Sequence, residues 1–587
     1  MKKTEKSRDV ALARLCRRES TRRREARILC RWQRSFVFRA LRALREIVAA
    51  TPLHSFALFL APIGLASLFR CLILPLLTDD FPLLPSGAFT GVVLSLLSLF
   101  LSMSHTSLSR VAALDTLPSR LLFDTLALPR PYVTPRRGIP WWSLLPLGLG
   151  LGVLSIYVSP LLLFGILLTS ALLLPALEVP EVSLILIGIV FPFSGLLAHP
   201  LLFLIVLVLF SVLAYLLKLA LGKRRISLTP EDLFVLLFSL TILFTGLITP
   251  SGVDGSLSGL VAGVLAASGY FLTANLLRTR RTILLLVRGL LSAGAVLGVL
   301  GIFLGILELA SPALPADGFL FHLIEGIKAI TGGSFSSYLL LLLPLSLGLM
   351  SSSRGEIVKG LPTFLLLLSA LVLTLSPTAY LAAILSLVLF LITVRRPFRA
   401  LPSLAFLSLA VLPLGVLFLP NEWVDALASG LPFLGLDTAL PDAFSLFREG
   451  LAVVRMHPFG TGEGLLSVPS LYLGLVLESG ILALILLLLA LYLPLRRSLI
   501  PSGERAARPL CRLSAGVAAG LLSLPVAGVL ENGFADRRVL LLFFLLLGLL
   551  SAIGRTAREE ESLSLDRPAE PRLASAELRL LRRARRE

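Results

Sequence analysis

Long apolar runs separated by short polar or basic segments are the dominant pattern of this chain. Most runs extend over about 17 to 25 residues, and a helix of that length crosses the hydrocarbon core of a bilayer. The pattern therefore predicts roughly 14 to 16 membrane spans. The predicted spans are residues 55–76, 87–103, 141–158, 161–176, 182–198, 200–221, 232–249, 257–276, 282–308, 337–351, 361–376, 378–394, 401–419, 470–494, 513–530 and 539–554.

Proline and glycine interrupt this pattern between residues 141 and 198, where kinked or re-entrant segments are expected. The span count allows for short or broken pairs in this region. The interrupting residues are Pro160, Pro175, Pro180, Pro192 and Gly195.

Composition supports the same fold class. Of the 587 residues, 56% are hydrophobic and only 15% are charged, and the mean hydropathy is +0.91. These values predict an all-α, polytopic transmembrane helix bundle. The net charge of +19 is spread over short runs between apolar segments rather than gathered on one folded face, so no nucleic-acid partner is expected.

The basic residues also predict an orientation, because lysine and arginine remain on the cytoplasmic side. With the N-terminus inside, the predicted spans place most basic loops on one face, and the C-terminus is then inside too. Those loops contain Arg136-Arg137, Lys223–Arg225, Arg278–Arg281, Arg354, Arg395-Arg396 and Arg496-Arg497. The opposite face receives residues 78–86, 250–256, 309–336, 420–469 and 531–538, where Arg537-Arg538 is the exception to the rule.

The chain divides into four predicted parts. Residues 1–50 form a basic cytoplasmic segment without a cleavable signal peptide, either an amphipathic helix on an anionic leaflet or a disordered tail. Residues 51–199 and 200–555 contain the transmembrane helices, the latter with an extracytoplasmic loop at 420–469. Residues 556–587 form a charged cytoplasmic tail.

Several kinds of chemistry are not expected. Histidines and cysteines lack metal-ligand spacing, so no metal site is predicted, and none of the four cysteines falls in a predicted extracytoplasmic loop. No phosphate-binding loop of the glycine-lysine-serine type is present, and no cofactor is expected.

The loop at 420–469 contains the first candidate site residues. Residues 444–456 are predicted to form a helix ending before Pro458, with Arg448 and Arg455 on one face about 10 Å apart. Such a guanidinium pair is suited to clamp the pyrophosphate of a lipid-linked donor. The alternative is that both arginines snorkel to lipid headgroups.

A glycine-rich turn follows this helix. The amides of Gly460 and Gly462 are candidates for close approach to a phosphate or sugar, and the alternative is a simple chain reversal. His457 and Glu463 are the candidate general bases, because an acceptor hydroxyl must lose its proton as it attacks. A histidine before proline is equally suited to a capping role.

The order of these motifs resembles the O-antigen ligase and polysaccharide polymerase superfamily over roughly residues 200–500. The matching features are His457-Pro458, Gly460-x-Gly462, x-Tyr472-Leu473 and Glu478-x-Gly480-Ile481. Upstream, Ser334–Leu347 and the serine-led segment 375–381 resemble the family's corresponding helices.

The resemblance implies a helical glycosyltransferase of the GT-C kind in the bacterial cytoplasmic membrane. Such an enzyme transfers glycan from an undecaprenyl-diphosphate carrier to a hydroxyl of a polysaccharide or glycolipid acceptor, on the outer face and without a required metal. Gly460, Gly462, Tyr472 and Glu478 are then substrate-binding residues, and membrane lipids and envelope-assembly proteins are the other partners.

The chain departs from the family pattern at three places. The characteristic His-Asn falls on Pro469-Ser470, so the histidine credited with activating the acceptor is absent. The Arg-x-x-x-Trp of the loop helix falls on Ala443 and Phe447, and Pro377 stands where a basic residue is common.

Three functions therefore compete: a glycan ligase or polymerase, a non-catalytic scaffold or binder of lipid-linked glycan, and a flippase or transporter. Transport predicts charges inside the spans that face a cavity. Arg70, Lys218 and Arg288 instead lie within about two turns of a predicted span end, which ranks transport last.

Overall fold

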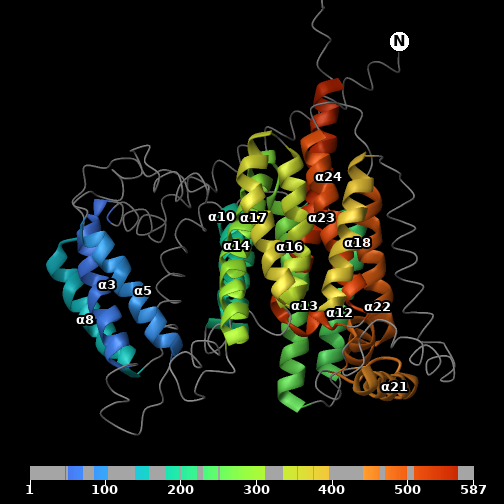
Figure 1. Ribbon diagram of the computed structural model, residues 1–587, viewed down its shortest axis with the longest axis horizontal. Helices are drawn as coiled ribbons and strands as arrows, with labels where there is room; N and C mark the ends of the chain where they lie inside the picture. Colours follow the sequence, from blue (N-terminus) through green and yellow to red (C-terminus); the bar gives the residue numbers. More distant parts are fainter. Residues whose placement is uncertain are drawn as a thin grey trace, which may run out of the picture. The chain divides into compact units, whose positions relative to one another are not determined.

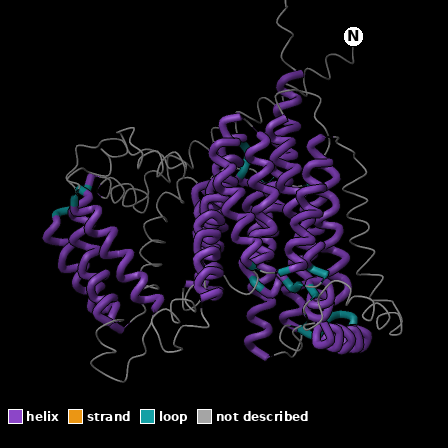
Figure 2. Tube along the Cα trace, viewed as in Figure 1, coloured by secondary structure: helices purple, strands orange, loops and turns teal. Residues whose placement is uncertain are grey.

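The fold is known from a computed structural model. It describes residues 50–70, 85–103, 139–157, 180–196, 200–220, 229–248, 252–310, 335–352, 354–374, 376–395, 440–462, 470–498, 508–529 and 531–565, and the single residues Ile47, Ile226 and Val468. All regular structure in these ranges is helical (Figure 2).

Eight helices in the described ranges are long and apolar enough to cross a membrane. Their apolar stretches are Pro230–Leu247, Ser258–Leu276, Arg280–Ile306, Phe335–Ser352, Glu356–Leu373, Leu471–Arg496, Pro509–Ala527 and Arg537–Glu560. Shorter apolar helices cover Leu53–Leu68, Trp142–Ser155, Glu181–Ser194, Leu204–Leu216 and Thr378–Val394. The chain is thus all-helical over these ranges, as composition predicts, and is compatible with a multi-pass membrane protein.

The chain separates into two compact units, residues 1–228 with 288–333 and residues 229–287 with 334–587. The helix α14 (Arg280–Ala310) is divided between them. In the first unit, α3 (Leu53–Leu68) packs against both α5 (Pro85–Ser102) and α8 (Trp141–Tyr157). The approach of α3 to α8 is close enough that a Cβ at Gly148 would lie 2.5 Å from the carbonyl oxygen of Phe59.

The proline-rich region of the first unit is broken as predicted. The helix α10 (Pro180–Val190) begins at Pro180 and passes directly into the short 3₁₀ helix η3 (Phe191–Leu196), which contains Pro192 and Gly195. Since proline removes a backbone donor, it ends the regular α-helical ladder here. The helix α11 (Pro200–Ala220) follows, whereas Pro160 and Pro175 lie outside the described residues.

The second unit contains the candidate site. Its helices are α12 (Pro230–Ile248), α13 (Gly252–Leu276), α16 (Phe335–Ser352), α17 (Arg354–Leu373), α18 (Pro377–Arg395), α21 (Leu440–Met456), α22 (Leu471–Ser498), α23 (Arg508–Ala527), the 3₁₀ turn η6 (Gly533–Ala535) and α24 (Arg537–Leu565). Most run side by side, and α21 lies across one end of them (Figure 1).

The centre of this unit is α24, whose apolar stretch is 89% buried. It packs against α13, α22 and α23, and small residues allow other close contacts. Gly348 of α16 faces Gly516 of α23, where an added Cβ would lie 3.0 Å from the neighbouring Cα. In the membrane, such small residues permit backbones to approach closely.

In the second unit, segments that are predicted to lie on the same side of the membrane meet at the same end of the helices. At one end, the Nη1 of Arg512 donates to the carbonyl oxygen of Ser351 at 2.7 Å. At the other end, the start of α16, the start of α18 and the α23–α24 connection meet at Glu531. This grouping agrees with the predicted alternation of spans within the unit.

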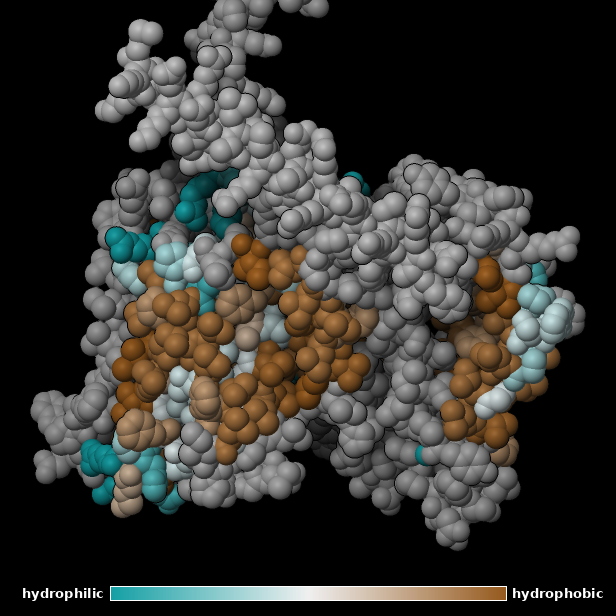
Figure 3. All heavy atoms as spheres, turned by 180° about the vertical axis from the view of Figure 1, so that it is seen from behind, coloured by the Kyte–Doolittle hydropathy of each residue, from teal (hydrophilic) through white to brown (hydrophobic). Residues whose placement is uncertain are grey.

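The outer surface is apolar. In the second unit, hydrophobic side chains form a broad band on the face seen in Figure 3, with hydrophilic residues above and below it. Leu240, Phe244 and Leu247 of α12 and Leu482 and Ile485 of α22 are among the exposed residues. Large exposed apolar surface of this kind is expected where lipid is the solvent.

The described helices follow the predicted spans with shifts at their ends. The α-helix α21 begins at Leu440 rather than at residue 444, and α3 covers Leu53–Leu68 and passes into a π-helical turn at residues 69–70, while residues 71–76 of that predicted span lie outside the described residues. The predicted spans 161–176 and 401–419, the N-terminal segment before Ile47 and the tail after Leu565 lie outside the described residues.

Candidate functional site

The helix α21 is amphipathic and packs on the start of α22. Gly450, Leu451 and Val454 are buried, and a Cβ at Gly450 would lie 2.9 Å from the Leu473 side chain. Arg448 and Arg455 are both on the exposed face, as their spacing predicts. A helix of this kind, lying across the ends of transmembrane helices, is suited to a membrane interface.

The turn after α21 is held against a break in α22. At Gly480 the backbone has a φ of 85°, so the regular hydrogen-bond ladder of α22 is interrupted. The freed groups are paired with the turn: the Thr461 amide donates to Leu477 at 2.7 Å, the Gly462 amide to Glu478 at 3.2 Å, and the Ile481 amide to Pro458 at 3.1 Å. The turn therefore fixes the geometry of the helix around Glu478.

The Gly480→Ala variant is expected to lose more than about 1–2 kcal/mol of stability, because a left-handed φ strains an alanine. Its Cβ would also lie 2.7 Å from the carbonyl carbon of Phe459. Thermal unfolding of the purified protein measures the loss. Gly150→Ala in α8 is the control, because a Cβ there meets nothing within 4 Å. An unchanged midpoint for Gly480→Ala would contradict this account of the break.

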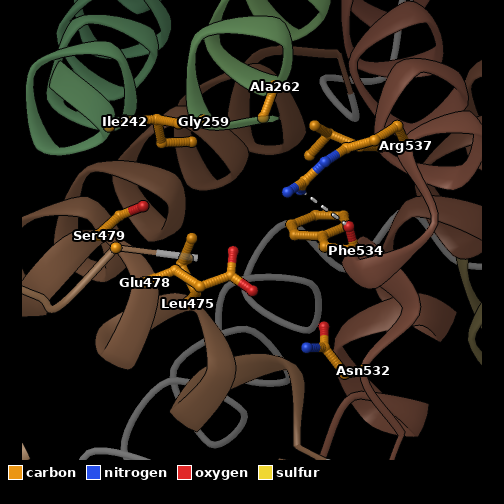
Figure 4. Close-up of a pocket in the computed structure, with 12 residues that line it drawn as sticks. Ile242, Gly259, Ala262, Leu475, Glu478, Ser479, Asn532, Phe534 and Arg537 are labelled. Atoms are coloured by element: carbon orange, nitrogen blue, oxygen red, sulfur yellow. Dashed lines mark hydrogen bonds between the residues drawn. The ribbon is translucent and has the colours of Figure 1, made fainter. Parts of the chain in front are cut away.

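A pocket lies between α12, α13, α22 and the start of α24 (Figure 4). Its empty space, including open solvent at the mouth, is about 470 Å³. The apolar and glycine part of the lining is Ile242, Gly246, Gly259, Ala262, Gly462, Leu475, Phe534 and Leu540, and the polar part is Glu478, Ser479, Asn532 and Arg537. Most of these residues lie within about two turns of a helix end, which is the depth of a membrane interface.

Arg537 brings a cationic side chain to this pocket from the first turn of α24. The residue is 8% exposed. Its Nη2 donates to the Ser258 hydroxyl at 3.1 Å and its Nη1 to the Phe534 carbonyl at 3.3 Å. These two contacts hold the guanidinium beside the space that Glu478 also lines (Figure 4).

The neighbouring arginine is arranged differently. Arg538 forms an ion pair with Asp536, with 2.8 Å between Nη2 and Oδ2, and does not line the pocket. A guanidinium that forms a forked contact with a carboxylate is already matched in geometry and charge. Of the two arginines, only Arg537 lines the pocket, and it is therefore the better candidate for binding an anionic ligand there.

The predicted site residues separate into three groups. Gly462 and Glu478 line the pocket, while Gly460 supports it by packing against Gly480. His457, like Arg448 and Arg455, is exposed and is not part of the pocket lining.

Two further predicted residues lie elsewhere. Tyr472 is buried, and its hydroxyl donates to the Pro525 carbonyl at 3.0 Å, which ties α22 to α23. Glu463 lies outside the described residues. The structure thus brings together only part of the predicted set.

Arg537, Asn532 and Ser258 were not predicted as site residues. The sequence contains one signal for the first of them, because Arg537-Arg538 is a basic pair on the face where the positive-inside rule expects few. The positive-inside rule does not explain a basic pair in a loop that is predicted to be extracytoplasmic, so another role for Arg537 or Arg538 is expected. No comparable pattern marks Asn532 or Ser258.

Among the described residues, no cluster of three or more histidine, cysteine or acidic side chains is placed to hold a metal ion. The sequence was also compared with known proteins: no protein-family model matches it, and no curated protein matches it significantly.

Proposed function

We propose that this protein is a membrane glycan ligase or polymerase, which transfers a glycan from a polyisoprenyl-diphosphate carrier to an acceptor hydroxyl. The motif resemblance over residues 200–500 suggests undecaprenyl diphosphate as the carrier and the outer face of a bacterial cytoplasmic membrane as the location. Both termini would then be cytoplasmic.

The observation that carries the proposal is the pocket itself. A buried arginine and a carboxylate, from two different helices, line one space near the ends of apolar helices. A lipid diphosphate needs this combination: an apolar environment for its chain and a cation for its phosphates at interface depth. Arginine suits the second task because its donors match phosphate oxygens.

The chemistry assigns a role to each group. The acceptor oxygen forms a bond to the anomeric carbon of the glycan as the bond from that carbon to the diphosphate oxygen breaks. The acceptor proton passes to the Glu478 carboxylate, which acts as general base. Arg537 stabilises the negative charge on the departing diphosphate, and Asn532 lies where it can donate to a sugar or phosphate oxygen.

The exposed arginines of α21 take a supporting role in this proposal. Arg448 and Arg455 lie on the outer face of an interfacial helix, where they can hold lipid headgroups near the pocket. This assignment differs from a direct clamp on the pyrophosphate, because neither residue lines the pocket.

One observation favours the non-catalytic alternative, a binder of lipid-linked glycan or a scaffold. Ser470, which stands at the asparagine of the family's His-Asn motif, is 3% exposed. Its hydroxyl donates to the Gly528 carbonyl at 3.2 Å, so the position ties the start of α22 to the α23–α24 connection. With proline in place of the motif's histidine and a structural serine in place of its asparagine, this segment supports a scaffold or binder.

Deletion of the gene from its host and complementation separate these functions. Without the protein, lipid-linked glycan is expected to accumulate and mature surface polysaccharide to decrease on gels. Wild type should reverse both changes, whereas Arg537→Ala should not. Rescue by Arg537→Ala, or an unchanged glycan profile after deletion, would contradict the proposed transferase and favour the scaffold.

A further inference from the structure

Three residues that line the pocket lie in or directly after the connection between α23 and α24. The structure describes residues 528–529 and 531–536 of this connection. Asn532 and Phe534 lie within it and Arg537 directly follows it. On one side, the Gly528 carbonyl accepts bonds from the Leu471 amide at 2.8 Å and from the Ser470 hydroxyl. On the other side, a carboxylate holds the connection to two other helices.

That carboxylate is Glu531, and three hydroxyls donate to it. Its Oε2 accepts from the Ser336 hydroxyl at 3.2 Å, and its Oε1 accepts from the hydroxyls of Ser376 and Thr378. These donors come from the start of α16 and from the start of α18. Three hydroxyls from two other chain segments thus converge on one side chain, so this cluster is a junction of three segments.

Ser376 also belongs to the local structure of α18. Its hydroxyl oxygen accepts a bond from the Ala379 amide at 3.2 Å, which caps the first turn of the helix. The serine-led segment 375–381 therefore has an identified use: it presents Ser376 and Thr378, on either side of Pro377, to Glu531.

The junction is coupled to the pocket through the covalent chain. Asn532 follows Glu531 directly, and its side chain fits against α22 so closely that a Cβ at Gly474 would lie 2.6 Å from its Nδ2. The Asn532 carbonyl also accepts the Ala535 amide at 3.3 Å in the turn that leads to Arg537. A shift of residue 531 would thus displace the polar groups of the pocket.

We propose that Glu531 is a positioning residue, which fixes Asn532 and Arg537 in the pocket by anchoring the α23–α24 connection to the starts of α16 and α18. The inference rests on the proposed function for its catalytic consequence, but the positioning itself is independent of it. A carboxylate suits the role because both oxygens accept, whereas an amide offers one acceptor oxygen.

The positioning is tested by cysteine labelling of the purified full-length protein. In a background in which Cys16, Cys30, Cys71 and Cys511 are replaced by alanine, Asn532→Cys is labelled with a water-soluble maleimide. Adding Glu531→Ala is expected to raise the labelling rate about tenfold, because the connection opens locally. Glu531→Gln should give a smaller rise.

Two controls separate positioning from a general loss of structure. Ser386→Ala removes a buried hydroxyl of α18 that bonds only within its helix, to the Ala383 carbonyl at 2.8 Å, and should leave labelling at residue 532 unchanged. A second reporter, Ser346→Cys, lies in the interior of α16. Its labelling should not respond to Glu531→Ala. Equal increases at residues 532 and 346 would overturn the proposal, as would unchanged labelling at 532.

The catalytic consequence is measured separately, with native cysteines and a lipid-linked oligosaccharide as donor. Glu531→Ala should lower kcat more than it raises KM, and Glu531→Gln should restore part of the rate. If no variant, wild type included, transfers glycan while the labelling difference is present, the proposed function fails and the positioning stands. Full transfer by Glu531→Ala would overturn the positioning.

Discussion

Replacement of Arg537 by alanine is expected to lower glycan transfer by about 100- to 1,000-fold, the usual effect of removing one group that stabilises developing charge. The guanidinium is buried beside the pocket and is held by Ser258 and the Phe534 carbonyl, so it requires little reorganisation when the diphosphate departs. The rate of release of the polyisoprenyl diphosphate from a lipid-linked donor measures this effect.

Arg537→Lys and Arg538→Ala are the matched controls for this prediction. Lysine keeps the charge but loses the fork of donors, so part of the rate should return. Arg538 is the chain neighbour of Arg537, but it is paired with Asp536, and its loss should change transfer by less than about threefold. If Arg538→Ala were as damaging as Arg537→Ala, the assignment of the diphosphate to Arg537 would be wrong.

The Glu478→Gln variant should reduce transfer by about 100- to 10,000-fold, the range that general-base catalysis supplies. Glutamine preserves the size of the side chain and leaves the backbone contact between the Gly462 amide and residue 478 possible. Donor binding should therefore persist while kcat falls. Initial rates at several donor concentrations separate the two parameters.

Glu449→Gln provides the comparison for Glu478. This glutamate is exposed on α21 and does not line the pocket, so its neutralisation should leave kcat within about twofold of wild type. Equal activity of Glu478→Gln and wild type would contradict a role for Glu478 as base and would leave the pocket as a binding site only.

The helices were predictable because their signal is strong and local. Apolar runs bounded by arginine or proline define α12, α13, α16 and α22 almost to their ends. The amphipathic α21 and its end before His457 also follow from spacing and from Pro458. The start of α21 is less well predicted: the helix begins at Leu440, one turn before the predicted residue 444.

The pocket was only partly predictable, because it is assembled from segments far apart in sequence. The motif order pointed to Gly462 and Glu478, which lie on adjacent segments. Arg537 comes to them through the packing of α24 against α13 and α22, and no local pattern encodes that approach. The spacing of Arg448 and Arg455 places both on one face of a helix. Because a ligand clamp and an interfacial helix share that spacing, it does not distinguish the two roles.

Reconstitution tests the central claim most directly. The purified full-length protein is placed in lipid nanodiscs with an undecaprenyl-diphosphate-linked oligosaccharide and a glycolipid or oligosaccharide acceptor, and free undecaprenyl diphosphate is measured together with the elongated acceptor. Wild type should produce both in equal amounts, and Arg537→Ala should produce neither above background. A folded wild-type protein that binds the donor but releases no undecaprenyl diphosphate with any acceptor offered would contradict the transferase and identify a binding protein instead.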